Sequence, residues 1–506
     1  MRYWHLKNLW LADGSKTPLK KSELLISEEG NISAVGAGNI GSAAGAVIDL
    51  GGCVAAPGFI DVHGHSDLAI AALPGAFGRV SQGVTCEIAG NCGLSAFPLT
   101  ENNREHLEKL YSKYQTNLNW QSFQEYAAFI KSRAPFCDVE ALTGHNTLRA
   151  AVSGYGKSEL DENALFTACK LLGESLNSGS CGLSLGLLYV PGKFATDEEL
   201  TALFSTVARH GKTVTCHLKS EGKMLCESIC DMLRISRQSG LKKFHISHFK
   251  TAGRENFSKL DKALELISEA GKDGISVTFD RYPYTQSMTQ LSLVLPDKWS
   301  DVDDVTITEQ LQDNGIFRSV LDELHTLRDE KYWQSVLLVN TPHPGYAGMR
   351  GAPLAALGND PALAVLEILR YDSPQTTAAF SGMSKDNMVK IICDPRCMPG
   401  SDGTALDPDG SFGTDHPRSF GAVAKFIRLL LDNNISIPES VHRATGLAAS
   451  TFDLAGRGAI TCGAAADITV FDPEEIDGKA SFASPFTPAS GIKLVFKNGN
   501  IVHRDF

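Results

Sequence analysis

The sequence has no long apolar run and no excess of positive charge, and each absence excludes a class of protein. None of its segments reaches the ~18 consecutive apolar residues of a membrane-spanning helix, and its first eleven residues lack a basic stretch followed by an apolar one. Lys plus Arg number 47 against 58 Asp plus Glu, a formal charge of -11, which argues against a nucleic-acid or anionic-membrane surface. We therefore expect a cytoplasmic protein whose partner is a small molecule, and the sequence leaves its oligomeric state open.

Cysteines are present, but pairs of cysteines at zinc-finger spacing are absent. The twelve cysteines are scattered, several within apolar runs such as Thr215-Cys216-His217. This placement indicates reduced, mostly buried thiols rather than a disulfide framework. Cys393 and Cys397 have no second pair to complete a metal knuckle, so we do not expect one there.

The two ends of the chain share a pattern of short β-like segments that the middle lacks. Short β-like segments broken by Gly, Asn and Asp occupy residues 24–27, 32–35 and 47–50, and similar segments return at 466–471 and 492–500. Neither end has enough strands to bury a sheet face alone. We predict that residues 1–56 and 456–506 fold together into one small β-sandwich domain.

The middle of the chain alternates apolar β-like runs with helical stretches, which is typical of parallel βα units. Eight such runs lie at 59–65, 83–90, 139–145, 181–187, 213–218, 243–249, 276–282 and 388–394. This number predicts an α/β fold in which residues 57–455 form a (β/α)8 TIM-like barrel. A charged, helix-prone segment at about 290–345 reads as a small insertion before the last barrel strand.

The first of these runs closes on His63-Gly64-His65. Strand side chains repeat every two residues, so both imidazoles leave the same face, which is a metal-ligand geometry. A bare His-x-His pattern is short, and a pair of ordinary structural histidines at a strand end is its commoner explanation. The context has to decide between the two.

Other candidate metal ligands fall at the ends of further runs. Cys92 follows the second run, His217 closes the fifth and His248 closes the sixth, and a barrel carries its active site at the C-terminal ends of its strands. Two imidazoles with a thiolate suit zinc and leave a fourth position for water. His63 and His65 complete a second metal position that shares Cys92.

The chemistry also needs a group that handles protons. Gly400-Ser401-Asp402-Gly403 places a carboxylate after the eighth run, between glycines that let backbone approach closely. An SDG sequence by itself is typical of a turn. Its position opposite the metal-bearing strands favours Asp402 as the general base.

Positive and hydroxyl side chains at the same end indicate the kind of substrate. Lys250 lies two residues beyond His248, Tyr282 ends the seventh run, and Arg418 follows the eighth. Together they form a clamp for a carboxylate, with Arg bidentate and Lys as a point charge. Ser287 is the weakest member of this set.

Taken together, the motifs resemble a known family. They are, in order, APGFIDVHGHSD, GVTCEIAGNCG, TGHNTLRAAVSG, GLSLGLLYVPG, HLKSEG, ISHFKTAG, DRYPYTQSMT, PGSDG, HPRSFG and GRGAITCGAAADITVFDP. The chain resembles the amidohydrolase superfamily and, within it, the N-acyl-D-amino-acid deacylases (D-aminoacylases), over nearly its whole length.

The resemblance implies a zinc-dependent enzyme that hydrolyses the amide bond of N-acyl-D-amino acids. It implies a tight zinc held by Cys92, His217 and His248, a weaker site at His63 and His65 bridged by Cys92, and catalysis by Asp402. It also implies that the substrate carboxylate is recognised by Lys250, Tyr282, Ser287 and Arg418. The D stereochemistry rests on the resemblance alone.

Two alternatives remain open. A cyclic amide hydrolase of the hydantoinase or dihydropyrimidinase kind, or an N-carbamoyl amino acid hydrolase, shares the barrel and the His-x-His. Hydantoinase-like relatives need a carboxylated lysine in the fourth strand, and residues 181–187 contain none. A non-catalytic scaffold on the same fold normally lacks its ligands, whereas all the candidate ligands and Asp402 are present here.

Overall fold

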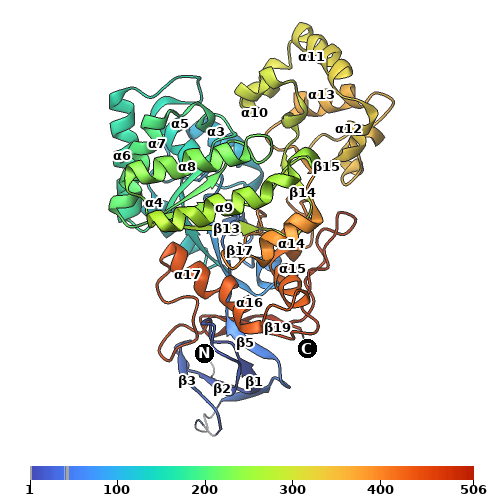
Figure 1. Cartoon of the computed structure of the whole chain (residues 1–506). Coiled ribbons are helices and arrows are strands. Elements are labelled where there is room, and N and C mark those ends of the chain that lie inside the picture. The colour runs from blue at the N-terminus through green and yellow to red at the C-terminus, as the bar shows by residue number, and fades with distance from the viewer. Residues whose placement is uncertain (1–2, 39, 41–44, 506) are drawn as a thin grey trace.

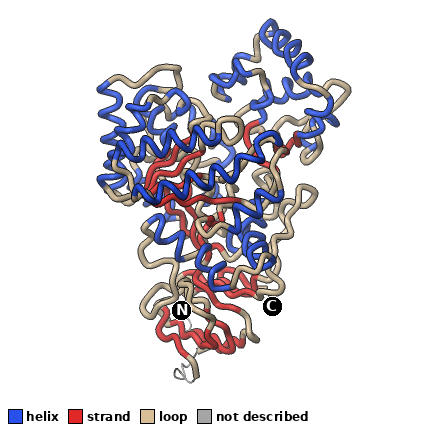
Figure 2. Tube along the Cα trace, viewed as in Figure 1, coloured by secondary structure: helices blue, strands red, loops and turns tan. Residues whose placement is uncertain are grey.

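The computed structural model describes residues 3–38, 40 and 45–505, and a closed barrel of parallel strands lies at its centre (Figures 1 and 2). The barrel strands are β6 (Phe59–Asp61), β7 (Val84–Ala89), β8 (Asp138–Ala141), β9 (Thr143–Gly144), β10 (Gly182–Gly186), β11 (Thr213–His217), β12 (Lys243–Ile246), β13 (Ser276–Arg281) and β17 (Cys397–Pro399). Only Leu142 separates β8 from β9, so these two pieces act as the third barrel strand. The predicted (β/α)8 architecture is confirmed.

The barrel closes through backbone contacts between its first and last strands. Pairing runs in parallel from β6 through β7 to β8, and from β9 through β10, β11, β12 and β13 to β17. The Val62 N–H donates to the Pro399 carbonyl at 3.1 Å, and Gly64 and Gly403 form a parallel bridge. The first and eighth strands therefore lie side by side, and their C-terminal ends face one another.

Amphipathic helices cover the barrel from outside. They are α1 (Ala69–Ala72), α2 (Phe77–Val80), α3 (Arg104–Leu110), α4 (Phe123–Ser132), α5 (His145–Ser153), α6 (Glu162–Asn177), α7 (Asp197–Arg209), α8 (Leu225–Ser239), α9 (Leu260–Ala270), α14 (Lys385–Cys393), α15 (Arg418–Asp432), α16 (Ile437–Ala444) and α17 (Gly446–Phe452). In α7, Thr196 caps the first turn and the buried Leu200, Leu203 and Val207 recur at helical spacing toward the core. None of the described helices combines the length and apolarity needed to cross a membrane.

The prediction for the eighth strand was wrong. Residues 388–393 lie in helix α14, Asp394 caps its end, and the last barrel strand is β17, only three residues long. In α14 the buried Met388, Ile391 and Ile392 recur at spacings of three and four, so the apolar run follows helical periodicity. Asp402 still follows the eighth strand, because β17 ends only three residues before it.

Strands from both chain ends build one sheet below the barrel (Figure 1). Its strands are β1 (Trp4–Leu11), β2 (Lys20–Ile26), β3 (Ile32–Gly36), β4 (Ala46–Asp49), β5 (Val54–Pro57), β18 (Ile468–Phe471), β19 (Ile492–Lys497) and β20 (Asn500–Arg504). The order is β20-β19-β18-β5-β1-β2-β3, with β4 paired to β1. The antiparallel β5–β18 pairing joins the two ends of the chain, as the sequence predicts.

A network of charged side chains, here called the base network, ties this sheet to the amino-terminal end of the barrel. It consists of Arg457, Asp138, Asp467 and Lys497. Arg457 contacts Asp138 at 2.5 Å and Asp467 at 3.2 Å, and Lys497 contacts both carboxylates at 2.8 Å. Each charge in it faces an opposite one, which is how a protein offsets the cost of burying ions.

The segment between β13 and β17 forms a second antiparallel unit with a core of its own (Figure 1). Its strands are β14 (Gln286–Gln290), β15 (Val336–Asn340) and β16 (Thr377–Ser381), and its helices are α10 (Asp304–Gln310), α11 (Asn314–Leu327), α12 (Glu330–Ser335) and α13 (Pro361–Asp372). These elements run from residue 286 to 381, a longer stretch than the predicted 290–345. The division of the chain into domains stays a prediction.

Candidate metal and catalytic centre

Side chains from four different strand ends meet at the C-terminal mouth of the barrel. His63 follows β6, Cys92 follows β7, His248 follows β12 and Asp402 follows β17. One donor atom from each lies within 4.8 Å of the others, and we call these four residues the mouth cluster. The sequence analysis named all four, and the fold brings them together from positions up to 339 residues apart.

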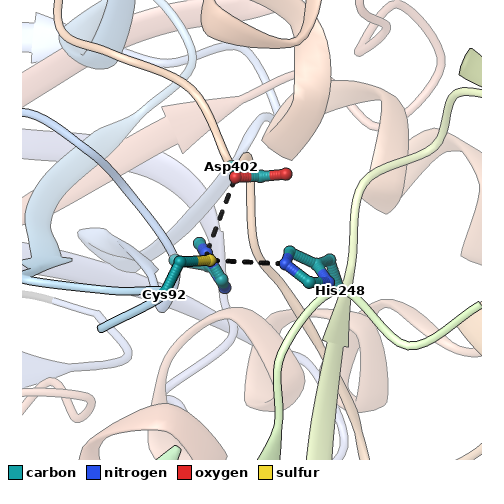
Figure 3. Close-up of side chains that lie close together, drawn as sticks. Cys92, His248 and Asp402 are labelled. Carbon is teal, nitrogen blue, oxygen red and sulfur yellow. Dashed lines mark hydrogen bonds and ion pairs between the residues drawn. The ribbon is translucent and has the colours of Figure 1, made fainter. Parts of the chain in front are cut away.

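The Cys92 sulfur lies at the middle of the mouth cluster. It is 3.3 Å from His63 Nε2 and 3.4 Å from His248 Nε2, and Figure 3 shows it pointing at the His248 ring with Asp402 close by. The Asp402 Oδ1 atom lies 3.6 Å from His63 Nε2. A thiolate, two imidazoles and a carboxylate are thus within reach of one ion, a donor set that suits zinc.

The backbone of three of these residues is in the left-handed region. The φ angles are 52° at Cys92, 36° at His248 and 51° at Asp402. Such angles are uncommon for residues other than glycine, and they persist where the surrounding structure over-determines them, typically at functional sites. The turns after three strands therefore aim these side chains inward.

A second group of donor atoms adjoins the first through His248. His217, Glu221 and His248 each offer a donor atom within 4.8 Å of the others. Glu221 lies 2.8 Å from His248 Nδ1 and 3.8 Å from His217 Nε2. Glu221 belongs to the HLKSEG motif, but sequence reasoning gave it no role.

His217 supplies the test of whether a metal fits here. Its side chain is buried, yet neither ring nitrogen has a hydrogen-bond partner among the described residues. An unpartnered buried polar group costs free energy unless something binds it. His217 therefore has the unmet bonding capacity of a metal ligand, and its grouping with Cys92 and His248 around one zinc stays a prediction.

His65 joins the mouth cluster through Asp402. Its Nε2 atom is 3.0 Å from Asp402 Oδ1, and 28% of its side chain is exposed. It packs edge-on against the His63 ring, with centroids 5.4 Å apart. The structure thus brings His65 to Asp402, while His63 reaches both Asp402 and the thiolate.

Asp280 is a buried carboxylate below the cluster that the sequence analysis did not single out. It lies 3.1 Å from His63 Nδ1 and 2.9 Å from His245 Nε2, and it accepts a hydrogen bond from the His248 backbone N–H at 3.0 Å. A carboxylate on the distal nitrogen fixes the orientation of a metal-binding imidazole. The available signal was an aspartate near the carboxyl end of barrel strand β13, the end at which a barrel carries its active site.

Opposite charges hold the cluster in its ionised form. Burial raises the pKa of the Cys92 thiol, but the imidazoles of His63 and His248 outweigh it, and the net pKa lies well below its ordinary value. Burial likewise raises the pKa of Asp402, yet the Arg418 guanidinium and the His65 ring bring it well below the ordinary range. Both groups are therefore available as anions, the form that binds a metal or accepts a proton.

The residues predicted to clamp a carboxylate lie around the cluster to different degrees. Arg418 lies 2.8 Å from Asp402, and its guanidinium is 4.9 Å from the centre of the Tyr282 ring. Lys250 forms a close ion pair with Glu221. The buried Tyr282 hydroxyl has no hydrogen-bond partner among the described residues.

Ser287 lies in strand β14 of the inserted segment, where its backbone pairs with Phe380. Among the described residues no side-chain hydrogen bond or ion pair joins it to the mouth cluster. Its role in substrate binding stays a prediction.

Comparisons with known proteins agree with this architecture. Residues 46–311 match the model of the amidohydrolase family. Two curated relatives come from Alcaligenes xylosoxydans xylosoxydans. An N-acyl-D-glutamate deacylase is 29% identical over 97% of this chain and 91% of that protein. A D-aminoacylase is 28% identical over 97% of this chain and 92% of that protein.

A solved structure resembles the chain over its whole length. It is the N-acyl-D-glutamate deacylase of Bordetella bronchiseptica complexed with zinc and a phosphonate that mimics the tetrahedral intermediate. The TM-score is 0.82 at 28% identity, and the alignment covers 99% of this chain and 96% of that one.

Proposed function

Because the chain belongs to the amidohydrolase family, we propose that it is a zinc-dependent hydrolase of N-acyl-D-amino acids. The products are a carboxylate and a free D-amino acid. The deacylases and the D-aminoacylase to which it is similar along almost all of its length support this substrate class.

One observation carries the proposal: the convergence of the mouth cluster with His217. A thiolate, imidazoles and a carboxylate come from different strand ends into one buried place, next to a histidine whose ring nitrogens are unpartnered. This is the donor set of a catalytic zinc site with a carboxylate left over for proton transfer.

In the proposed mechanism, Cys92, His217 and His248 would hold the tight zinc, and His63 and His65 together with Cys92 would hold a second ion more weakly. The ion supplies Lewis acidity for the acyl carbonyl and the attacking water. Asp402 takes the proton from that water as the new C–O bond forms. It then donates the proton to the leaving nitrogen as the C–N bond breaks.

The substrate carboxylate binds through Arg418, Lys250 and the Tyr282 hydroxyl, with Ser287 at the rim. Arg418 and Lys250 are paired with Asp402 and Glu221 in the free protein. A bound carboxylate would add a second anion beside each cation. The Tyr282 hydroxyl, which has no partner among the described residues, would donate a hydrogen bond to that carboxylate.

The test is a substrate panel run on wild type and on Asp402→Asn, with zinc measured in each protein. We expect wild type to hydrolyse N-acetyl-D-amino acids in preference to the L isomers. Asp402→Asn should lose about 10²- to 10⁴-fold in kcat while keeping its zinc. Retained activity in Asp402→Asn would refute its role as the base.

The same panel separates the alternative reactions. Hydantoins and N-carbamoyl amino acids are assayed beside the acetylated substrates, and preference for either contradicts the proposal. The fourth barrel strand argues against the hydantoinase kind, because β10 reads Gly-Leu-Ser-Leu-Gly and offers no lysine to bridge two metals. A chain that bound no zinc and cleaved no acyl amide would be a scaffold.

We further propose that the enzyme works in the cytoplasm. All twelve cysteines lie among the described residues and are free, which fits a reducing compartment.

A further inference from the structure

The loop that carries Cys92 has an unusual backbone conformation, which contacts from outside the loop must stabilise. Gly90, Cys92 and Gly93 all have positive φ, at 75°, 52° and 78°. A cysteine pays a steric cost there that glycine does not. Something outside the loop must keep Cys92 in this conformation, and thereby keep its sulfur between His63 and His248.

The stabilising contacts come from the neighbouring fourth strand. Ser184, at the middle of β10, has a fully buried side chain. Its hydroxyl donates a short hydrogen bond to the Gly90 carbonyl and accepts one from the Gly93 N–H at 3.1 Å. The Ser184 side chain therefore hydrogen-bonds to the backbone on both sides of Cys92 in this turn.

The packing around this contact leaves the loop little freedom. Leu183 and Leu185 belong to the main apolar core, while Ser184 lies between them in the alternation of the strand. At the end of the same strand, a Cβ added to Gly186 would fall 2.0 Å from the Cys92 carbonyl oxygen. The backbones of β10 and of the Cys92 loop are thus in direct contact at Gly186, and the Ser184 side chain hydrogen-bonds to the loop backbone.

We propose that Ser184 is a positioning residue that holds Cys92 in the geometry needed to bind the tight zinc. The fourth strand would then contribute to the metal site indirectly, by fixing a ligand from the second strand. The inference rests on the proposed function only in taking Cys92 as a zinc ligand.

The chain offers a matched control in Ser180, four residues earlier. Its side chain is also fully buried, and its hydroxyl bonds the Ala141 carbonyl at 3.0 Å and the Thr143 hydroxyl at 3.0 Å. It contacts the opposite end of the same strand, away from the mouth. Ser180→Ala thus removes a comparable buried hydroxyl without touching the Cys92 loop.

The experiment measures zinc affinity of the full chain by competition with a chromogenic chelator. Proteins reconstituted with Co²⁺ also report the thiolate-to-cobalt charge-transfer absorption, which requires the Cys92 sulfur on the metal. We expect Ser184→Ala to weaken zinc binding about 10- to 100-fold, the usual effect of losing a residue that orients a ligand, and to weaken the absorption. Ser180→Ala should change neither, and Ser184→Thr, which keeps the hydroxyl, should stay within about threefold of wild type.

Several results would overturn the inference. These are an unchanged zinc affinity in Ser184→Ala, equal losses in Ser184→Ala and Ser180→Ala, or no rescue in a folded Ser184→Thr. Thermal melting establishes that each variant is folded. If Ser184→Ala is not, Ser184→Cys replaces it with the same expectations, because a thiol is a weak hydrogen-bond partner.

The outcome is separable from the proposed function, because no measurement uses a substrate. A chain that binds zinc through Cys92 but hydrolyses no N-acyl-D-amino acid refutes the function and leaves the role of Ser184 standing. If Cys92→Ala binds zinc as tightly as wild type, Cys92 is not a ligand and the inference falls.

Discussion

The two ends of the barrel both bury charge, but they differ in what is left unpaired. At the amino end, the base network pairs Arg457 and Lys497 with Asp138 and Asp467, and none of their fully buried side-chain atoms lacks a hydrogen-bond partner among the described residues. At the mouth, the nitrogens of His217 and the hydroxyl of Tyr282 are buried without partners.

The backbone shows the same contrast. Cys92, His248 and Asp402 have positive φ at the mouth, whereas none of the four residues of the base network is among the described residues with positive φ. Unmet bonding capacity and strained turns cost stability, and they are retained where a ligand repays that cost. The comparison thus distinguishes the mouth, whose side chains are arranged to bind a ligand, from the base network, whose side chains stabilise the fold.

The largest effect should come from removing the central ligand of the mouth. Cys92→Ala should lose its zinc and, with it, several kcal/mol of transition-state stabilisation, on the order of 10³-fold or more in kcat/KM. His63→Ala should lose less zinc, because the proposed mechanism assigns His63 to the weaker site. Metal analysis and steady-state kinetics check both, and the reverse order would make His63 the primary ligand.

The base network should respond in stability and not in catalysis. Arg457→Met leaves Asp138 and Asp467 short of a partner in a largely buried place, where 19% of the Arg457 side chain is exposed. We expect a loss of about 2–3 kcal/mol in unfolding free energy, somewhat below the value for full burial, with kcat unchanged. The control in urea denaturation is Arg234→Met, whose exposed ion pairs should be worth less than about 1 kcal/mol. A large change in kcat in Arg457→Met would erase the contrast between the ends.

Tyr282→Phe tests an unpaired group at the mouth. The hydroxyl has no partner in the free protein, so its removal should leave the melting temperature unchanged or slightly raised. If the hydroxyl hydrogen-bonds to the substrate carboxylate, losing it should cost about 1 kcal/mol of binding free energy, so KM should rise roughly fivefold. An unchanged KM with lower stability would mean that the hydroxyl is structural.

The smallest effect is a pH dependence at the base. Burial raises the pKa of Asp138, but Arg457 and Lys497 outweigh it and hold the pKa below its ordinary value of 3.8. A carboxyl whose pKa is lower in the folded than in the unfolded state stabilises the fold above pH 3.8. This stability is lost as the pH falls below 3.8 and through the folded pKa. Asp138→Asn should therefore be less stable than wild type by about 1 kcal/mol at pH 7, and denaturation at pH 7, 5 and 3 should show this difference shrinking.

Most of the barrel could be predicted from the sequence because its buried strands are continuous apolar runs and its helices have apolar residues at helical spacing. The eighth strand could not, since three residues, Cys397–Pro399, give no periodicity. The stronger apolar signal nearby belonged to helix α14.

The convergence of candidate ligands was predictable where one lies at or just beyond the end of a strand, as His217 and His248 do. Glu221 lies in an irregular loop after β11, and its proximity to His248 Nδ1 at 2.8 Å depends on how that loop folds back. Asp280 and Ser184 act through other residues, and a strand sequence does not reveal which loop a buried polar side chain will meet. Ser287 lies in strand β14 of the inserted antiparallel sheet, where it is paired with Phe380, and its part in substrate binding stays a prediction.

The pairing of β5 with β18 sets an order on how the protein is made. Val54–Pro57 leaves the ribosome early, but its partner Ile468–Phe471 is synthesised roughly 20–80 s later at ~5–20 residues per second. During that interval one edge of β5 is open to other chains. Strands β1 to β5 can pair with one another on the emerging chain, whereas the β5–β18 pairing must wait until Ile468–Phe471 has been made.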